Sequence, residues 1–172
     1  MSTRVAHLTS LHIALDTRVF YKECRTLAQA GYDVHLVVHD PPVEEQDGVT
    51  FHAIPRATGS KWTRAVERLR SVYRIARSLD AAAYHFHDPE LIPVGIALKK
   101  TGAKVIYDAH EDAPNQAMRS LKFRPVDARI LAAFYTVYER MAARLLDGFV
   151  MAWPGLEERF PRSKRIVIAN YP

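Results

Sequence analysis

Short apolar runs alternate with longer amphipathic stretches along the chain. The apolar runs predict β-strands at residues 4–8, 34–38, 49–54, 82–86, 104–107 and 148–151, with a last apolar run at 166–168. Apolar residues at helical spacing predict helices after Asp16, over residues 62–79, from Asp88 to Lys100 and around residues 130–145. This alternation is typical of an α/β fold with a doubly wound parallel sheet.

Two of the predicted helices carry their apolar residues on one face. In the helix over 62–79 this face consists of Trp62, Val66, Leu69, Tyr73 and Ala76. In the helix around 130–145 it consists of Ile130, Phe134, Tyr138, Met141 and Leu145. Such a face normally packs against the core, so we expect these side chains to face the sheet.

The size and composition are those of one globular domain. The chain has 172 residues, of which 48% are apolar and 25% charged. No apolar run approaches the roughly 20 residues that a transmembrane helix needs, and the first ten residues lack the pattern of a secretion signal. We therefore expect a cytoplasmic protein. The single cysteine, Cys24, falls in an apolar helical pattern and is expected to be buried.

The net charge of +5 favours anionic partners. Much of the positive charge falls in the helix over 62–79 and on Lys61 just before it, with arginines at 64, 68, 70, 74 and 77. Two interpretations remain open: this helix contacts an anionic membrane surface or a lipid-phosphate acceptor, or its basic face is simply solvated. No recognised DNA-binding or RNA-binding motif is present, so nucleic acid is not an expected partner.

Polar segments follow three of the predicted strands. They are residues 9–18 (TSLHIALDTR), 85–90 (HFHDPE) and 108–112 (DAHED). In a doubly wound sheet the ligand lies beyond the carboxyl ends of the strands, near helix N-termini that favour anions. If the second and third of these strands are neighbours in the sheet, their polar side chains meet there.

Several interpretations of these side chains compete. Imidazoles and carboxylates are common metal ligands, although no known ligand signature is completed elsewhere in the chain. Alternatively, Asp88 only caps a helix, His85 points into the core, and Asp108 accepts hydrogen bonds from loop amides. For His110, which is flanked by carboxylates, we favour a ligand site, because an imidazole that titrates near neutrality can donate hydrogen bonds to a hydroxyl or an anion.

Missing motifs narrow the possible functions. The seven glycines form neither the G-x-G-x-x-G fingerprint nor the phosphate-binding loop of P-loop proteins, which argues against a dinucleotide-dependent dehydrogenase and a P-loop hydrolase. The G-x-S-x-G motif of serine hydrolases is also missing.

Three segments resemble consecutive blocks of the family-four retaining glycosyltransferases. The first runs from Asp16 to Glu23 (DTRVFYKE) and continues to AGYDV at residues 30–34. The second is HFHDPEL at residues 85–91, and the third is VIYDAHED at residues 105–112. The blocks occur in the family's order, at the expected strand ends, and together span most of the chain.

The resemblance implies a GT-B architecture, in which two Rossmann-like domains face each other across a cleft. The first domain binds the acceptor, and the second binds most of the nucleotide-sugar donor. Residues 1–172 would be the N-terminal, acceptor-side domain, so we expect a nucleotide-sugar domain absent from this chain and a fragment that is inactive alone. The implied reaction transfers a sugar to a glycan or lipid-linked acceptor with retention of configuration, without a metal or other cofactor. If the basic helix over 62–79 contacts the membrane, the protein would be peripheral at the inner membrane surface.

The resemblance also suggests site residues. By motif match, His110 corresponds to a histidine that reaches the donor sugar and is the expected catalytic residue. The expected substrate-binding residues are Asp16, Arg18, His87, Asp88, Glu111 and Asp112. The chain departs from the family in one loop, because residues 9–15 contain no glycine whose amide could approach the donor phosphates.

Two rival functions remain open. One is a standalone α/β module that binds an anionic glycan or phosphate without catalysis. The other is a metal-dependent hydrolase that uses His87, Asp88, Asp108 and His110.

Overall fold

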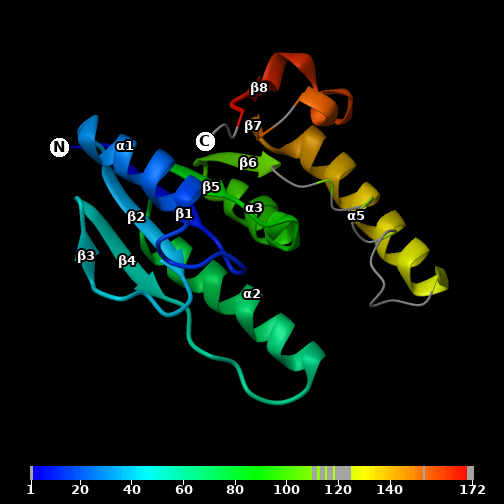
Figure 1. Cartoon of the computed structure of the whole chain (residues 1–172), viewed down its shortest axis with the longest axis horizontal. Helices are drawn as coiled ribbons and strands as arrows, with labels where there is room; N and C mark the ends of the chain where they lie inside the picture. The colour runs from blue at the N-terminus through cyan, green and yellow to red at the C-terminus, as the bar shows by residue number, and fades with distance from the viewer. Residues whose placement is uncertain are drawn as a thin grey trace.

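An eight-stranded sheet forms the centre of the computed structural model, which describes residues 2–109, 112, 115, 118, 125–152 and 154–169 (Figure 1). The strand order is β3-β4-β2-β1-β5-β6-β7-β8. The strands are β1 (Arg4–Leu8), β2 (Asp33–Val38), β3 (Glu45–Gln46), β4 (Val49–Ala53), β5 (Ala83–Phe86), β6 (Lys104–Ala109), β7 (Gly148–Met151) and β8 (Arg165–Val167). All pairs are parallel except β3 with β4. The predicted doubly wound parallel sheet is therefore confirmed.

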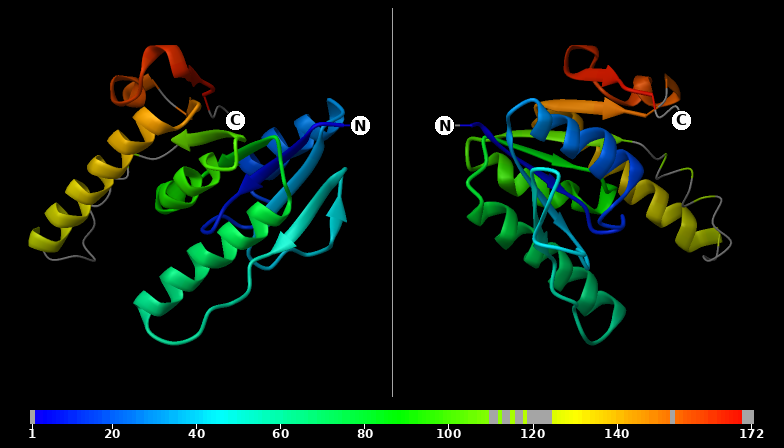
Figure 2. Two further views of the ribbon diagram at one scale, coloured as in Figure 1. Left: turned by 180° about the vertical axis from the view of Figure 1, so that it is seen from behind. Right: turned by 60° about the vertical axis from the view of Figure 1, so that its left-hand side comes forward.

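Helices cover the two faces of the sheet (Figure 2). The helical segments are η1 (Thr17–Cys24, a π-helix), α1 (Arg25–Gln29), α2 (Lys61–Ser78), η2 (Pro89–Leu91), α3 (Ile92–Lys99), α5 (Pro125–Leu145), η3 (Pro154–Arg159) and η4 (Arg162–Lys164). The β1-to-β2 connection runs toward one edge of the sheet, whereas the connections through α2, α3 and α5 run toward the other. Right-handed crossovers therefore put η1 and α1 on one face and α2, α3 and α5 on the opposite face.

Each face of the sheet has its own apolar core. The larger core lies on the side of α2, α3 and α5 and includes the buried rings of Tyr84, Phe86, Tyr107 and Phe149. Gly95 of α3 contacts the Phe86 ring so closely that a Cβ atom at this position would overlap it. The smaller core, beneath η1 and α1, is built from aromatic and aliphatic side chains that include Phe20, Leu36, Phe51 and the buried Cys24. The expected burial of Cys24 is confirmed.

Glycines with positive φ end two of the helical segments. Gly31 (φ 89°) follows α1 and Gly102 (φ 89°) follows α3, at the left-handed positions where glycine avoids steric cost. Positive φ also occurs in the turn that joins β3 to β4, at Asp47 (φ 54°) and Gly48 (φ 77°). The short antiparallel strand β3 has no periodic signal of its own and was not predicted.

The predicted core face of α2 is correct only in the second half of the helix. Ala76 is buried, and Leu69 and Tyr73 are half-buried against the larger core. Trp62 and Val66, in contrast, are 84% and 43% exposed. The first turns of α2 extend beyond the edge of the sheet, so no core is available to them (Figure 1).

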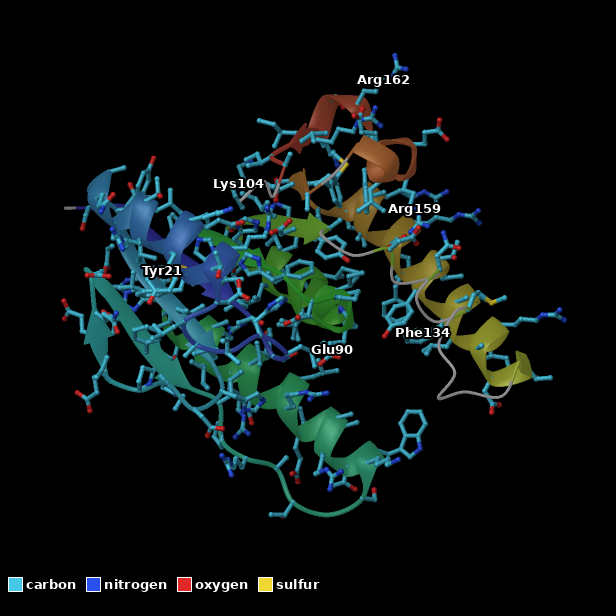
Figure 3. The ribbon with its side chains drawn as sticks, viewed as in Figure 1. Tyr21, Glu90, Lys104, Phe134, Arg159 and Arg162 are labelled. Atoms are coloured by element: carbon cyan, nitrogen blue, oxygen red, sulfur yellow. The ribbon has the colours of Figure 1, made fainter. Side chains whose placement is uncertain are left out.

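The predicted core face of α5 is wrong for most of its residues. Ile130 and Phe134 are 65% and 50% exposed, and Met141 and Leu145 are also exposed. The buried positions are instead Ala128, Glu139, Ala142 and Leu146. Part of the cause is the same as in α2, because much of α5 projects past the sheet, with Phe134 on this projecting part (Figure 3). Near the end of α5 the helix is packed against the larger core, but through the neighbouring face that carries Ala142 and Leu146. None of the described helices is both long and apolar enough to cross a membrane.

Candidate functional site at the carboxyl edge of the sheet

The carboxyl ends of β1, β5 and β6 lie side by side in the sheet. The register pairs His7 of β1 with His85 of β5. His87 follows β5 and contacts Asp108 of β6, with Nδ1 3.2 Å from Oδ2. Because side chains alternate along a strand, His85 and His87 lie on the same face, which is the face that η1 covers. The prediction that the two polar segments meet is confirmed.

Arg18 joins η1 to this cluster. Its Nε donates to Oδ2 of Asp108 at 2.7 Å and its Nη2 donates to Oδ1 at 3.0 Å, while Nη1 donates to the carbonyl of Ile168 at 3.2 Å. Both side chains of this bidentate pair are buried. Asp108 therefore binds an arginine and a histidine. The interpretation that it also accepts hydrogen bonds from loop amides stays a prediction, because most of the loop after β6 lies outside the described residues. The expected contact of Arg18 with substrate stays a prediction.

The charged side chains of the cluster shift one another's pKa values. Burial alone would raise the pKa of Asp108, but hydrogen bonds from His87 and Arg18 outweigh burial and hold this pKa far below its ordinary value. Burial opposes protonation of His87, yet its hydrogen bond to Asp108 and the nearby Glu23 carboxylate raise its pKa. For Glu23, burial is the main cause that raises the pKa to about 7. The surroundings thus favour the ionised form of Asp108 beside Arg18 and the protonated form of His87, and raise the pKa of Glu23 to about 7.

Two members of the cluster were not among the predicted site residues. His7 is fully buried in β1, and Nδ1 of its ring lies 3.1 Å from Nε2 of His87. Glu23 of η1 lies beneath the helix, with Oε2 3.5 Å from Nδ1 of His85 and 3.8 Å from Nδ1 of His7. No signal in the sequence marks the position of Glu23, because residues five apart do not share a face on an α-helix. Glu23 comes to the side of Arg18 because η1 is a π-helix.

Asp88 fixes the loop after β1 and does not act as the predicted helix cap. Its Oδ2 accepts hydrogen bonds from the Ser10 amide at 2.6 Å and from the Thr9 hydroxyl at 2.9 Å. Its side chain makes no capping hydrogen bond to η2. Ser10 also donates to Glu90 at 2.8 Å, and Glu90 lies 3.0 Å from Arg68 of α2 (Figure 3). The loop after β1 is therefore fixed by hydrogen bonds to both Asp88 and Glu90.

Asp16 begins η1. Its Oδ1 accepts hydrogen bonds from the amides of Arg18 at 2.8 Å and Val19 at 2.9 Å. Burial opposes ionisation, but these amides and the neighbouring His12 lower the pKa of Asp16. His12 lies between two carboxylates, 3.4 Å from Asp16 and 3.6 Å from Asp88. Because His12 and Asp16 are only partly buried, they form the solvent-facing rim of the site.

The expected catalytic histidine follows directly after β6. His110 and Glu111 lie outside the described residues. Asp112 is bound by Nη2 of Arg159 and accepts a hydrogen bond from the amide of Asn115 at 3.2 Å. Arg159 also donates to the buried Glu139 of α5 at 3.1 Å. Asp112 is thus tied to η3 and α5 and not to the histidine cluster.

The arrangement combines a rigid interior with a polar rim. The interior pairs fix both the loop after β1 and the start of η1, and the rim offers an imidazole and carboxylates to the hydroxyl groups of a ligand. Four side chains of the interior also form a possible metal-binding group: His7, Glu23, His85 and His87. This set differs from the one predicted for a hydrolase, because Asp88 and Asp108 are not part of it.

Residues 17–162 match the model of Glycosyltransferase Family 4. A search of curated proteins gives no match. Solved structures share the fold of nearly the whole chain. For sucrose-phosphate synthase from Thermosynechococcus elongatus the TM-score is 0.74 at 12% identity, covering 97% of this chain and 48% of that one. For a ugt transferase from Siraitia grosvenorii in complex with UDP the TM-score is 0.59 at 13% identity, covering 99% of this chain and 48% of that one.

A UDP-glucosyltransferase from Polygonum tinctorium gives a TM-score of 0.54 at 13% identity, with coverage of 100% of this chain and 52% of that one. At such identities the likeness concerns the fold alone. The chain spans about half the length of these glycosyltransferases, and the shared fold is one Rossmann-like half of the GT-B architecture.

Proposed function

Because this chain belongs to glycosyltransferase family 4, we propose that it is the acceptor-side half of a retaining glycosyltransferase that uses a nucleotide-sugar donor. The observation that carries this proposal is the family match over residues 17–162, which runs from η1 through the polar carboxyl edge to η4. The donor would be bound mainly by a second Rossmann-like domain, since the chain covers 48% of the sucrose-phosphate synthase chain.

The rim of the site is suited to a hydroxyl-rich acceptor. His12 and Asp16 are partly exposed and lie next to each other, so they can donate to and accept from sugar hydroxyls. Arg18, His87 and Asp88 support this rim from behind through their buried hydrogen bonds. In this proposal His110, with Glu111 and Asp112 after it, contacts the donor sugar and stabilises charge near the departing phosphate.

The proposal is tested on the complete natural gene product. Transfer is assayed with a panel of UDP-, GDP- and ADP-sugars, and the anomeric configuration of the product is read by NMR. His110→Ala should lower kcat by at least about 100-fold if the imidazole stabilises the transition state. His52→Asn, in β4 on the far side of β2, is the matched control and should leave kcat unchanged.

An inverted product would contradict the retaining mechanism. Full activity of His110→Ala would contradict its catalytic role. If the complete gene product ended near residue 172 and bound glycans without transferring sugar, the binding-module alternative would replace the enzyme.

We further propose that the first turns of α2 contact an anionic membrane surface on the cytoplasmic side and thereby guide a lipid-linked acceptor. The exposed Trp62 lies between the exposed Lys61 and Arg64, and this end of α2 projects beyond the sheet (Figure 1). An amphipathic indole flanked by basic side chains suits the membrane interface.

Vesicle sedimentation tests this contact. Binding to vesicles with anionic lipid should exceed binding to purely zwitterionic vesicles, and Trp62→Ser combined with Arg64→Glu should abolish the difference. Arg77→Glu changes an exposed arginine at the other end of α2 and is the matched control. Equal sedimentation of all variants would contradict the proposal.

A further inference from the structure

Three histidines and one glutamate converge between the sheet and η1. His7 belongs to β1, His85 belongs to β5, His87 follows β5, and Glu23 belongs to η1. Each offers one ligand atom, and these atoms all lie within 4.8 Å of one another. We propose that these four side chains bind one divalent transition-metal ion of the zinc type.

The measured distances are close to those between ligands of one ion. Oε2 of Glu23 lies 3.8 Å from Nδ1 of His7, 3.5 Å from Nδ1 of His85 and 3.8 Å from Nε2 of His87. Nδ1 of His7 lies 3.1 Å from Nε2 of His87. Four ligands at about 2.0–2.1 Å from a tetrahedral zinc ion are about 3.3–3.4 Å apart. These four distances differ from that spacing by a few tenths of an ångström, and all the ligand atoms lie within 4.8 Å of one another.

Hydrogen bonds explain this arrangement less well than an ion does. The distances from Oε2 of Glu23 to the three ring nitrogens are too long for hydrogen bonds. Among the described residues this oxygen is buried and has no hydrogen-bond partner. Such an oxygen costs stability unless something binds it, and a cation at the centre of the cluster would do so. Of the four distances given above, the one between His7 and His87 has the length of a hydrogen bond.

The surroundings of His87 match those of a metal-bound histidine. Its Nδ1 faces Oδ2 of Asp108 at 3.2 Å. In the metal-bound form the proton would stay on this nitrogen, beside the carboxylate, and the lone pair of Nε2 would face the ion. Asp108 is fixed in turn by the two hydrogen bonds from Arg18. Histidines that ligate metals usually donate their other N–H to a carboxylate in this way.

The position of the cluster indicates a structural ion. His7 and His87 are fully buried, and three imidazoles with one carboxylate fill the four positions of a tetrahedral ion. The ion would tie η1 to β1 and β5, and η1 begins with Asp16 and contains Arg18. It would therefore set the geometry of the rim without taking part in sugar transfer, which agrees with the metal-free chemistry that the family resemblance implies.

The test measures bound metal and thermal stability in the chain expressed without a histidine tag. The protein is stripped with a chelator, reloaded with Zn²⁺, desalted and analysed by mass spectrometry for elements. We expect one equivalent of zinc per chain, a higher Tm after reloading, and with Co²⁺ the intense visible absorption of a tetrahedral site. Less than about a tenth of an equivalent after reloading, or an unchanged Tm, would overturn the proposal.

Variants connect the metal to these residues. Glu23→Gln and His85→Asn should each abolish retention of zinc, and Asp108→Asn should weaken affinity by about 10–100-fold because it removes the carboxylate behind His87. The matched control is His35→Asn, which disrupts the second histidine pair, His35 with His52 at 2.8 Å. If one of the variants Glu23→Gln and His85→Asn does not fold, the proposal is judged on the zinc retained by the other. Retention equal to that of His35→Asn would assign the metal to another place and overturn the proposal.

Discussion

Arg18 and Asp108 stand 90 positions apart in the chain and form a buried bidentate pair, with Nε 2.7 Å from Oδ2 and Nη2 3.0 Å from Oδ1. The pair connects η1 with β6, and the third nitrogen of the guanidinium binds the backbone just after β8. Removing the arginine takes two hydrogen bonds away from a buried carboxylate and leaves it with His87. The stability of the whole carboxyl edge therefore depends on this pair.

We expect Arg18→Met to lower the free energy of unfolding by about 3–5 kcal/mol, the usual cost of breaking one side of a buried ion pair. Urea denaturation followed by circular dichroism measures it. Arg18→Lys should recover only part of the loss, because lysine cannot form the two parallel hydrogen bonds. The control is Arg56→Met, which breaks the exposed pair with Asp40 and should barely move the midpoint. Equal midpoints for Arg18→Met and Arg56→Met would contradict the expectation.

A second prediction concerns Asp88 and the loop after β1. Asp88→Ala removes the acceptor of the Ser10 amide and of the Thr9 hydroxyl, so we expect a loss of about 1–3 kcal/mol and faster hydrogen exchange of the Ser10 amide. NMR-detected exchange reads the amide directly. Glu67→Ala, at an exposed position of α2, serves as the control. Unchanged protection of Ser10 would show that Asp88 does not fix the loop.

The close contact of Gly95 with Phe86 gives a third prediction. Gly95→Ala places a methyl group against the ring, which is stacked on Tyr107 with centroids 4.9 Å apart and has little room to move. Overpacking of this kind should cost about 1–3 kcal/mol, even though alanine is the better helix former. Thermal denaturation of Gly95→Ala, Phe86→Leu and the double variant tests the contact. The double variant should lose less than the sum of the single losses, and strict additivity would argue against the overlap.

The order of strands and helices was predictable because it follows from local periodicity. Residues 34–38 and 148–151 are short apolar runs bounded by turn residues, and each became a strand of the sheet. Helix faces were less predictable. Trp62 and Phe134 have the spacing of core residues, yet both are exposed. Trp62 lies in the first turn of α2, and Phe134 lies on the part of α5 that extends past the sheet (Figure 3). Sequence periodicity shows which residues share a face but not how far the core reaches.

The candidate site was predictable only in outline. The chain shows that His87 and Asp108 end consecutive strands, and the parallel sheet brings them together. The acceptor role of Asp88 toward Thr9 depends on a contact across 79 positions, and local rules suggested a helix cap instead. His7 was missed because a single histidine in an apolar strand carries no signal until the register pairs it with His85.

The last prediction concerns the pH dependence of stability at Glu139. Burial in α5 is the main cause that raises the pKa of Glu139 from 4.5 to about 7, with Arg159 acting in the opposite direction and Asp112 adding to the increase. Among the described residues, Arg140 and Glu158 line the same pocket as Glu139 and Arg159. Between pH 4.5 and about 7, Glu139 is protonated in the folded chain but ionised in the unfolded chain. Stability from this group is therefore greatest below about pH 4.5 and is lost as the pH rises to about 7.

Glu139→Gln removes this titration and keeps an acceptor for Arg159. We expect the variant to gain stability relative to the natural chain as the pH is raised from 5 to 8, with most of the gain complete just above the folded pKa of about 7. Urea denaturation at each pH gives the difference between the two proteins, which cancels the titration of other groups. Glu158→Gln, at an exposed position beside the same pocket, should give a flat difference. A flat difference for Glu139→Gln as well would mean that Arg159 keeps the buried carboxylate ionised throughout this range.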